Sequence, residues 1–65
     1  MMPIIVEWNS RTYYKPNYYQ IWRNGYWYSL KHGWLPAVKG NGRFFSTFKT
    51  REAAQGVLDQ LIGRA

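Results

Sequence analysis

The chain contains no cysteine, which excludes disulfide bridges and thiolate metal sites. A single histidine and three scattered acidic residues are too few for a zinc or iron site, so we expect neither a metal nor a cofactor. Without such cross-links, the 65 residues must be stabilised by one small apolar core. We therefore expect a single small domain over residues 1–65.

Long hydrophobic runs are also missing. The first seven residues have no basic start, and their apolar run is too short for a signal peptide. No later segment approaches the roughly 20 apolar residues that a membrane-spanning helix needs. With cysteine absent as well, we expect a cytoplasmic protein that does not associate with membranes.

Acidic residues are absent from Trp8 to Arg51, because Glu7, Glu52 and Asp59 all lie outside that stretch. The same stretch holds every aromatic residue and eight of the nine Lys and Arg residues, and the formal net charge is +6. Basic groups neutralise phosphates and aromatic faces stack on bases, so this composition favours nucleic acid as the partner. A second interpretation needs no ligand, because a small domain also uses large rings for its core and basic residues for solubility.

A β-hairpin is predicted over residues 18–31. Asn24-Gly25 lies between two aromatic runs and suits the two positive-φ positions of a type I′ turn. In a two-residue turn Trp22 faces Trp27, and the two rings should pack across the strands. Alternation then gives the hairpin two faces. One is predicted to be core (Tyr19, Ile21, Tyr28 and Leu30) and the other amphipathic (Tyr18, Gln20, Trp22, Trp27, Ser29 and Lys31).

The segment after the hairpin, residues 32–42, is interrupted by Pro36 and rich in glycine, so we expect an edge strand or an ordered loop. Residues 43–48 are predicted to form a third strand. Phe48 lies two residues before the next element, so we expect Phe44 and Phe48 to point inward.

A C-terminal helix is predicted over residues 51–62. Thr50 is a favourable N-cap, Glu52 complements the helix dipole, and apolar residues recur with helical spacing from Ala54 to Ile62. The predicted fold is therefore α+β: an antiparallel sheet of three strands, or of four if the N-terminal segment pairs as well, and one helix packed on one face.

The face of the sheet remote from the helix is predicted to be aromatic and basic. With Phe44 inward, Arg43, Phe45 and Lys49 share that face with Trp22, Trp27 and Lys31. The N-terminal residues from Ile4 to Trp8 either pair as an extra strand or fold across the face, since large exposed apolar patches are uncommon on monomers.

Three strands followed by one helix, with residues 43–54 across the last junction, resemble two families of DNA-binding domains. These are the arm-type domains of phage integrases and the plant ethylene-response-factor domains, and Phe48, Thr50, Ala53 and Ala54 match their strand-to-helix junction. The resemblance covers residues 18–62 and implies that the sheet face enters the DNA major groove. The chain departs from both families in its long insertion at 34–42 and in its density of Trp and Tyr. It also lacks a recombinase catalytic domain, which would make it a free-standing, phage-like binding module.

Catalysis is not expected. No serine has a base partner, and a lone histidine in a Lys-His-Gly turn is more often inert than catalytic. The glycine-containing loop at 39–43 lacks the spacing of a phosphate-binding loop.

We therefore expect a small, basic, non-enzymatic nucleic-acid-binding module that takes DNA in preference to RNA and acts as a monomer or weak homodimer. The alternative is a phage or mobile-element type of module that binds and inhibits a host protein with the same aromatic surface. The candidate binding residues are Trp22, Trp27, Lys31, Lys39, Arg43, Phe45, Lys49 and Arg51.

Overall fold

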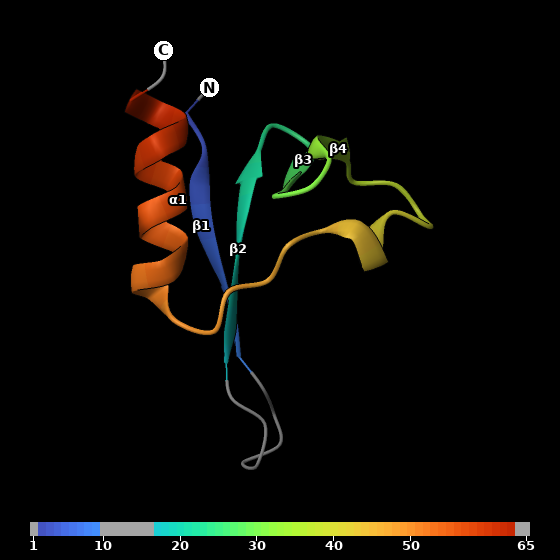
Figure 1. Ribbon diagram of the computed structural model, residues 1–65. Helices are drawn as coiled ribbons and strands as arrows, with labels where there is room; N and C mark the ends of the chain where they lie inside the picture. The colour runs from blue at the N-terminus through green and yellow to red at the C-terminus, as the bar shows by residue number, and fades with distance from the viewer. Residues whose placement is uncertain (1, 10–16, 64–65) are drawn as a thin grey trace.

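The computed structural model describes residues 2–9 and 17–63. In chain order the elements are β1 (Ile4–Trp8), β2 (Tyr18–Arg23), β3 (Tyr26–Ser29), β4 (Gly33–Pro36), a 3₁₀ helix (Gly42–Phe44) and α1 (Arg51–Gly63). The four strands form one antiparallel sheet in the order β1-β2-β3-β4, and α1 packs on one face of β1 and β2 (Figure 1). The predicted α+β class and the fourth, N-terminal strand are confirmed.

The turn of the predicted hairpin has the expected geometry. Asn24 and Gly25 have positive φ angles of 45° and 88°, and Trp22 pairs with Trp27. The hairpin is shorter than predicted, however, because β3 ends at Ser29. Lys31 therefore lies in the turn that leads into β4, and β4 is the edge strand expected in the 32–42 segment.

The predicted strand 43–48 is wrong. Its first residues belong to the 3₁₀ helix, and only Phe48 forms a bridge, with mutual backbone hydrogen bonds to Tyr19 of 2.8 and 2.9 Å. The physical reason is that β4 follows β3 through a short turn and already occupies the outer edge of β3. The later segment instead bonds where β2 and β3 have separated: Phe48 bridges Tyr19 of β2, and the Ser46 amide donates to the Tyr28 carbonyl of β3 at 3.1 Å.

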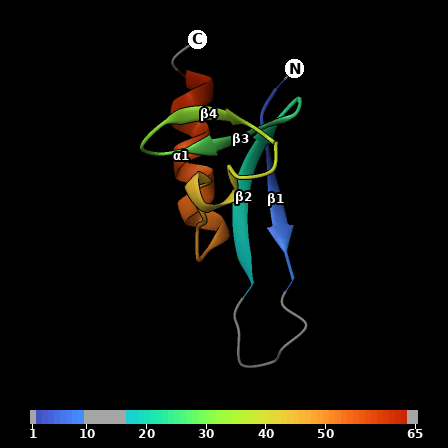
Figure 2. The same ribbon diagram turned by 90° about the vertical axis from the view of Figure 1, so that its right-hand side faces the viewer.

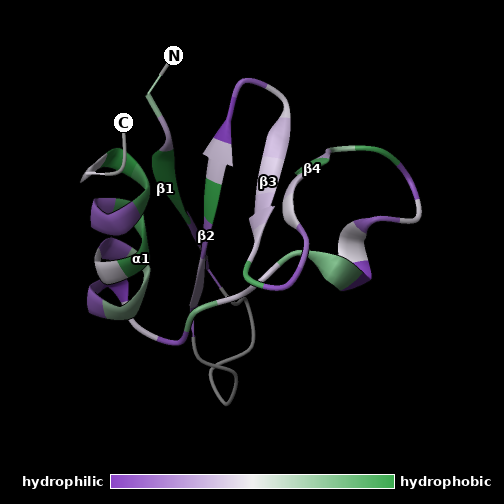
Figure 3. Ribbon diagram, turned by 45° about the horizontal axis from the view of Figure 1, so that its top comes forward, coloured by the Kyte–Doolittle hydropathy of each residue, from purple (hydrophilic) through white to green (hydrophobic). Residues whose placement is uncertain are grey.

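The main core lies between α1 and the sheet and consists of Ile21, Phe48, Ala54 and Leu58. The helix begins where predicted, because the Thr50 hydroxyl oxygen accepts a 3.1 Å hydrogen bond from the Ala53 amide. Figure 3 shows the apolar side of α1 turned toward the sheet and its hydrophilic side turned outward. The inward orientation of Phe48 is confirmed.

Two residues predicted to be core are exposed. Leu30 is 62% exposed because the strand has ended before it, and Phe44 is 41% exposed because it belongs to the 3₁₀ helix instead of a strand. Ile62, predicted to extend the apolar stripe of the helix, is also exposed.

The sheet is strongly curled. Figure 2 shows β3 and β4 crossing β1 and β2 at a large angle, with α1 on the far side. A right-handed twist between neighbouring strands is general, and it is largest in short two-stranded ribbons. The curl bends the sheet around the face opposite α1, which we call the concave face, and brings the side chains of this face close to one another.

Candidate functional site

Five rings of the described residues gather on the concave face, and we call them the aromatic cluster. Trp27 is at its centre, with ring centroids 6.0 Å from Trp8, 6.3 Å from Trp22 and 6.1 Å from Phe45. Tyr18 extends the cluster by stacking on Trp8 at 6.2 Å, with an angle of 19° between the ring planes. Offset and edge-to-face arrangements at these separations are favourable.

Strand register and curl together explain the cluster. Trp8 pairs with Tyr18 at one end of the sheet and Trp22 pairs with Trp27 at the other. Alternation puts all four side chains opposite α1, and the curl brings Trp8 onto Trp27 although their strands are not adjacent. Trp22, Trp27 and Phe45 thus lie together as predicted, but Phe45 reaches Trp27 from a crossing segment and not from a strand.

The concave face is less open than the sequence predicts. Gln20 and Ser29 lie on this face by alternation, yet only 9% and 1% of their surfaces are exposed. Trp22, Trp27 and Phe45 are half-buried against one another. These three rings therefore form a second small core. For this part of the cluster, the rings serve to pack the domain, as the interpretation without a ligand predicts.

The accessible rings are Trp8 and Tyr18, each 40% exposed. Neither was among the predicted binding residues. Strand alternation puts Trp8 on the same face as Val6, and Tyr18 on the same face as Gln20. Only the pairing of β1 with β2 brings Trp8 and Tyr18 side by side. The accessible part of the aromatic cluster thus lies toward the end of the sheet remote from the Asn24-Gly25 turn.

Four predicted binding residues, Lys31, Lys39, Arg43 and Lys49, have exposed side chains. The first three belong to the turn after β3, the loop after β4 and the 3₁₀ helix, and Figure 1 shows the 3₁₀ helix on the side of β2 away from α1. Lys49 follows the buried Phe48, so alternation directs it away from the main core. The Arg43 guanidinium lies 4.9 Å from the centre of the Phe44 ring, within the range of a cation–π interaction.

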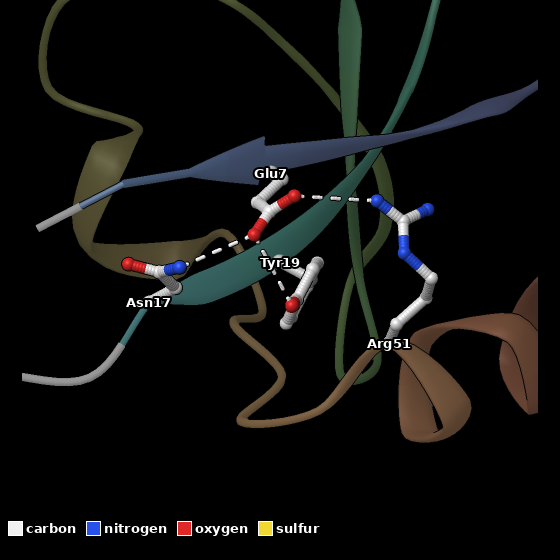
Figure 4. Close-up of polar contacts among 4 residues, drawn as sticks. All are labelled: Glu7, Asn17, Tyr19 and Arg51. Carbon is white, nitrogen blue, oxygen red and sulfur yellow. Dashed lines mark hydrogen bonds and ion pairs between the residues drawn. The ribbon is translucent and has the colours of Figure 1, made fainter.

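The structure separates Arg51, the remaining predicted binding residue, from the aromatic cluster. Its guanidinium lies 3.4 Å from a Glu7 carboxylate oxygen and 5.4 Å from the centre of the Tyr19 ring (Figure 4). Both partners belong to the sheet face covered by α1. The sequence did not reveal this pairing because Glu7 and Arg51 are 44 residues apart.

The Glu7 carboxylate also accepts hydrogen bonds from the Tyr19 hydroxyl at 3.3 Å and from the Asn17 side-chain amide at 3.2 Å. Loss of solvent around the phenol raises the pKa of Tyr19, and the adjacent Glu7 charge and hydrogen bond raise this pKa further. Figure 4 shows the carboxylate between its three partners. Glu7 is thus engaged in holding β1, β2 and the start of α1 together.

The acidic residues all lie on the side of the helix. Glu7 faces α1, while Glu52 and Asp59 belong to it, and Asp59 accepts a 2.8 Å hydrogen bond from the Gln55 amide. Among the described residues, the side bearing the aromatic cluster carries no acidic group. The cations on that side therefore have no local anion to oppose them.

Across residues 2–9 and 17–63, no group of three His, Asp or Glu side chains is placed to hold a metal ion. No helix in the same ranges is long and apolar enough to cross a membrane.

Comparisons with protein-family models, curated proteins and solved structures find no match to this chain. The resemblance to the two DNA-binding families therefore stays a prediction.

Proposed function

We propose that this protein binds single-stranded nucleic acid, DNA in preference to RNA, along the side that carries the aromatic cluster. The proposal rests on one observation: the three acidic residues lie on the side of α1, while Lys31, Lys39, Arg43 and Lys49 accompany exposed rings elsewhere. A surface with exposed cations, accessible rings and no acid suits a polyanion of stacked bases.

The shape of the sheet favours a single strand over a duplex. The major groove is about 12 Å wide and accepts a protruding helix or ribbon. Here the corresponding face is concave, and Trp22, Trp27 and Phe45 are half-buried in it. A flexible single strand can follow a concave surface and stack its bases on individual rings.

In this proposal Trp8 and Tyr18 stack on bases, and the four exposed cations contact phosphates. Trp22, Trp27 and Phe45 support the accessible rings from below, and Arg51 is not part of the interface because it is bound to Glu7. The protein acts as a binding module without catalysis.

The first experiment measures binding of labelled oligonucleotides of about 12 nucleotides by fluorescence anisotropy, a length within the usual site size of small single-strand binders. Single-stranded DNA, single-stranded RNA and duplex DNA are compared at about 50 and 200 mM salt. Four phosphate contacts should give a slope of log K against log salt of roughly −3 for a single strand.

A matched pair of variants tests the role of the rings. Trp8→Ala should weaken binding by about tenfold, because base–aromatic stacking is worth roughly 1–3 kcal/mol per base. Tyr26→Ala should not, since Tyr26 is similarly exposed, at 44%, but alternates onto the other face of the sheet.

Absence of salt-dependent binding to all three polymers would overturn the proposal. Attention would then pass to the alternative, a host protein bound through the same rings, for which affinity should change little with salt.

A further inference from the structure

A second feature near the aromatic cluster is a hollow of about 180 Å³ lined by His32, Leu35, Asn41 and Phe44. Its walls come from the turn after β3, from β4 and from the segment that contains the 3₁₀ helix. The rings of His32 and Phe44 meet edge to face, with centroids 5.5 Å apart. The hollow is mainly apolar and opens to solvent, and Phe44 in its wall is 41% exposed.

The loop that forms the hollow is held by hydrogen bonds. The Asn41 side-chain amide nitrogen donates to the Pro36 carbonyl at 3.0 Å, and the Phe44 amide donates to the Asn41 carbonyl at 2.9 Å. The Ala37 amide donates to the Gly25 carbonyl at 2.9 Å, which fixes the start of the loop to the hairpin turn. The exposed apolar surface is thus presented in a defined shape, and a preformed site loses less conformational entropy when a ligand binds.

Basic residues belong to the segments that form the hollow. Lys31 immediately precedes His32, Lys39 lies in the loop, and the Arg43 guanidinium lies over the Phe44 ring. No acidic residue occurs between Trp8 and Arg51 to neutralise them. An apolar hollow with a cationic rim is complementary to a flat, weakly polar group that is linked on both sides to anions.

The hollow adjoins the aromatic cluster. Leu35 in its wall is the direct cross-strand partner of Trp27, and Phe44 precedes Phe45, which packs on Trp27. A strand lying along Trp8 and Tyr18 and across the concave face therefore reaches the hollow without leaving the acid-free side.

We propose that the hollow takes one unstacked base of the bound strand, while Lys31 and Arg43 contact the phosphates on either side of that base. The Phe44 ring supplies the stacking surface. The Asn41 side-chain oxygen accepts a hydrogen bond from the base, because the amide nitrogen is already engaged by Pro36. This inference rests on the proposed function and adds a specific site for a base to it.

The test compares two strands of equal length and charge: an oligonucleotide of about 12 thymidines and its abasic analogue, in which each base is absent. The wild type should bind the strand with bases more tightly. Phe44→Ala should weaken binding of that strand by about tenfold and leave binding of the abasic strand unchanged. Phe44→Tyr keeps the ring and should bind both strands as the wild type does.

Leu30→Ala is the matched control, because Leu30 is 62% exposed close to the hollow but does not line it. Its affinity for both strands should equal that of the wild type. Thermal melting of each variant checks that the fold is retained. We expect it to be retained, because Phe44 and Leu30 are exposed and are not part of the main core.

The possible results separate the two proposals. If Phe44→Ala binds the strand with bases as tightly as the wild type while Trp8→Ala binds it more weakly, the base site is refuted and the proposed function stands. An equal loss on both strands would also refute the base site, because it would mean that Phe44 acts only by positioning Arg43. If the wild type binds neither strand, both proposals fall.

Discussion

Trp27→Ala should destabilise the protein more than the loss of any other ring in the aromatic cluster. Trp27 contacts the rings of Trp8, Trp22 and Phe45, whereas Trp22 has Trp27 as its ring partner in the cluster. Each aromatic pair is worth about 0.5–1.5 kcal/mol beyond the area that it buries. Because Trp27 is half-buried, we take the lower end of the 3–5 kcal/mol typical of Trp→Ala in cores, about 3 kcal/mol.

That loss is large for this protein. A domain of 65 residues has a free energy of unfolding of roughly 3–10 kcal/mol. The midpoint of thermal unfolding should fall by about 12–24 °C, since 1 kcal/mol corresponds to roughly 4–8 °C at this size. Trp22→Ala, which removes one ring pair within the aromatic cluster as described, from a similarly half-buried site, should cost only about 1–2 kcal/mol.

Urea unfolding followed by circular dichroism measures both variants without relying on tryptophan emission. Equal losses for Trp27→Ala and Trp22→Ala would refute the central role of Trp27. A loss below about 1 kcal/mol for Trp27→Ala would show that the rings do not form a second core.

Three further predictions concern individual contacts. Lys49→Gln should reduce the salt slope of oligonucleotide binding by about 0.7. Arg51→Gln should leave this slope unchanged, because Arg51 is paired with Glu7. Equal effects of the two substitutions would show that Arg51 also contacts the nucleic acid. Thr50→Ala should lower the free energy of unfolding by about 1 kcal/mol in urea titration through loss of the N-cap, with Thr50→Ser as the control that keeps it. The pKa of Tyr19 is raised in the folded state, so its contribution to stability is complete below the unfolded pKa of about 10 and is lost as pH rises through the folded pKa. Urea midpoints measured above about pH 10 should therefore fall more steeply for the wild type than for Tyr19→Phe, and parallel curves would contradict the shift.

Elements with local signals could be predicted from the sequence. The Asn24-Gly25 turn and the Thr50 cap each depend on a few consecutive residues, and both have the expected geometry. The contact between Trp22 and Trp27 followed directly from the two-residue turn.

Features that depend on distant parts of the chain were missed. The predicted strand at 43–48 failed because β4 competes for the edge of β3, and alternation within that segment cannot reveal this competition. Arg51 was placed in the binding surface because nothing local pairs it with Glu7. Trp8 and Tyr18 were overlooked because their exposure is set by the curl of the whole sheet.

The crossing segment between the 3₁₀ helix and α1 contributes side chains to the layers on both faces of the sheet. Within four residues it places Phe45 on Trp27 and Phe48 in the core under the helix, while the Ser46 amide donates to the Tyr28 carbonyl at 3.1 Å. Opening either layer must therefore disturb the other. A ligand that tightens the ring side should slow amide hydrogen exchange in α1, on the far side of the sheet, by mass action on a shared opening equilibrium. Amide exchange rates in α1 would therefore show whether a ligand is bound on the side of the aromatic cluster.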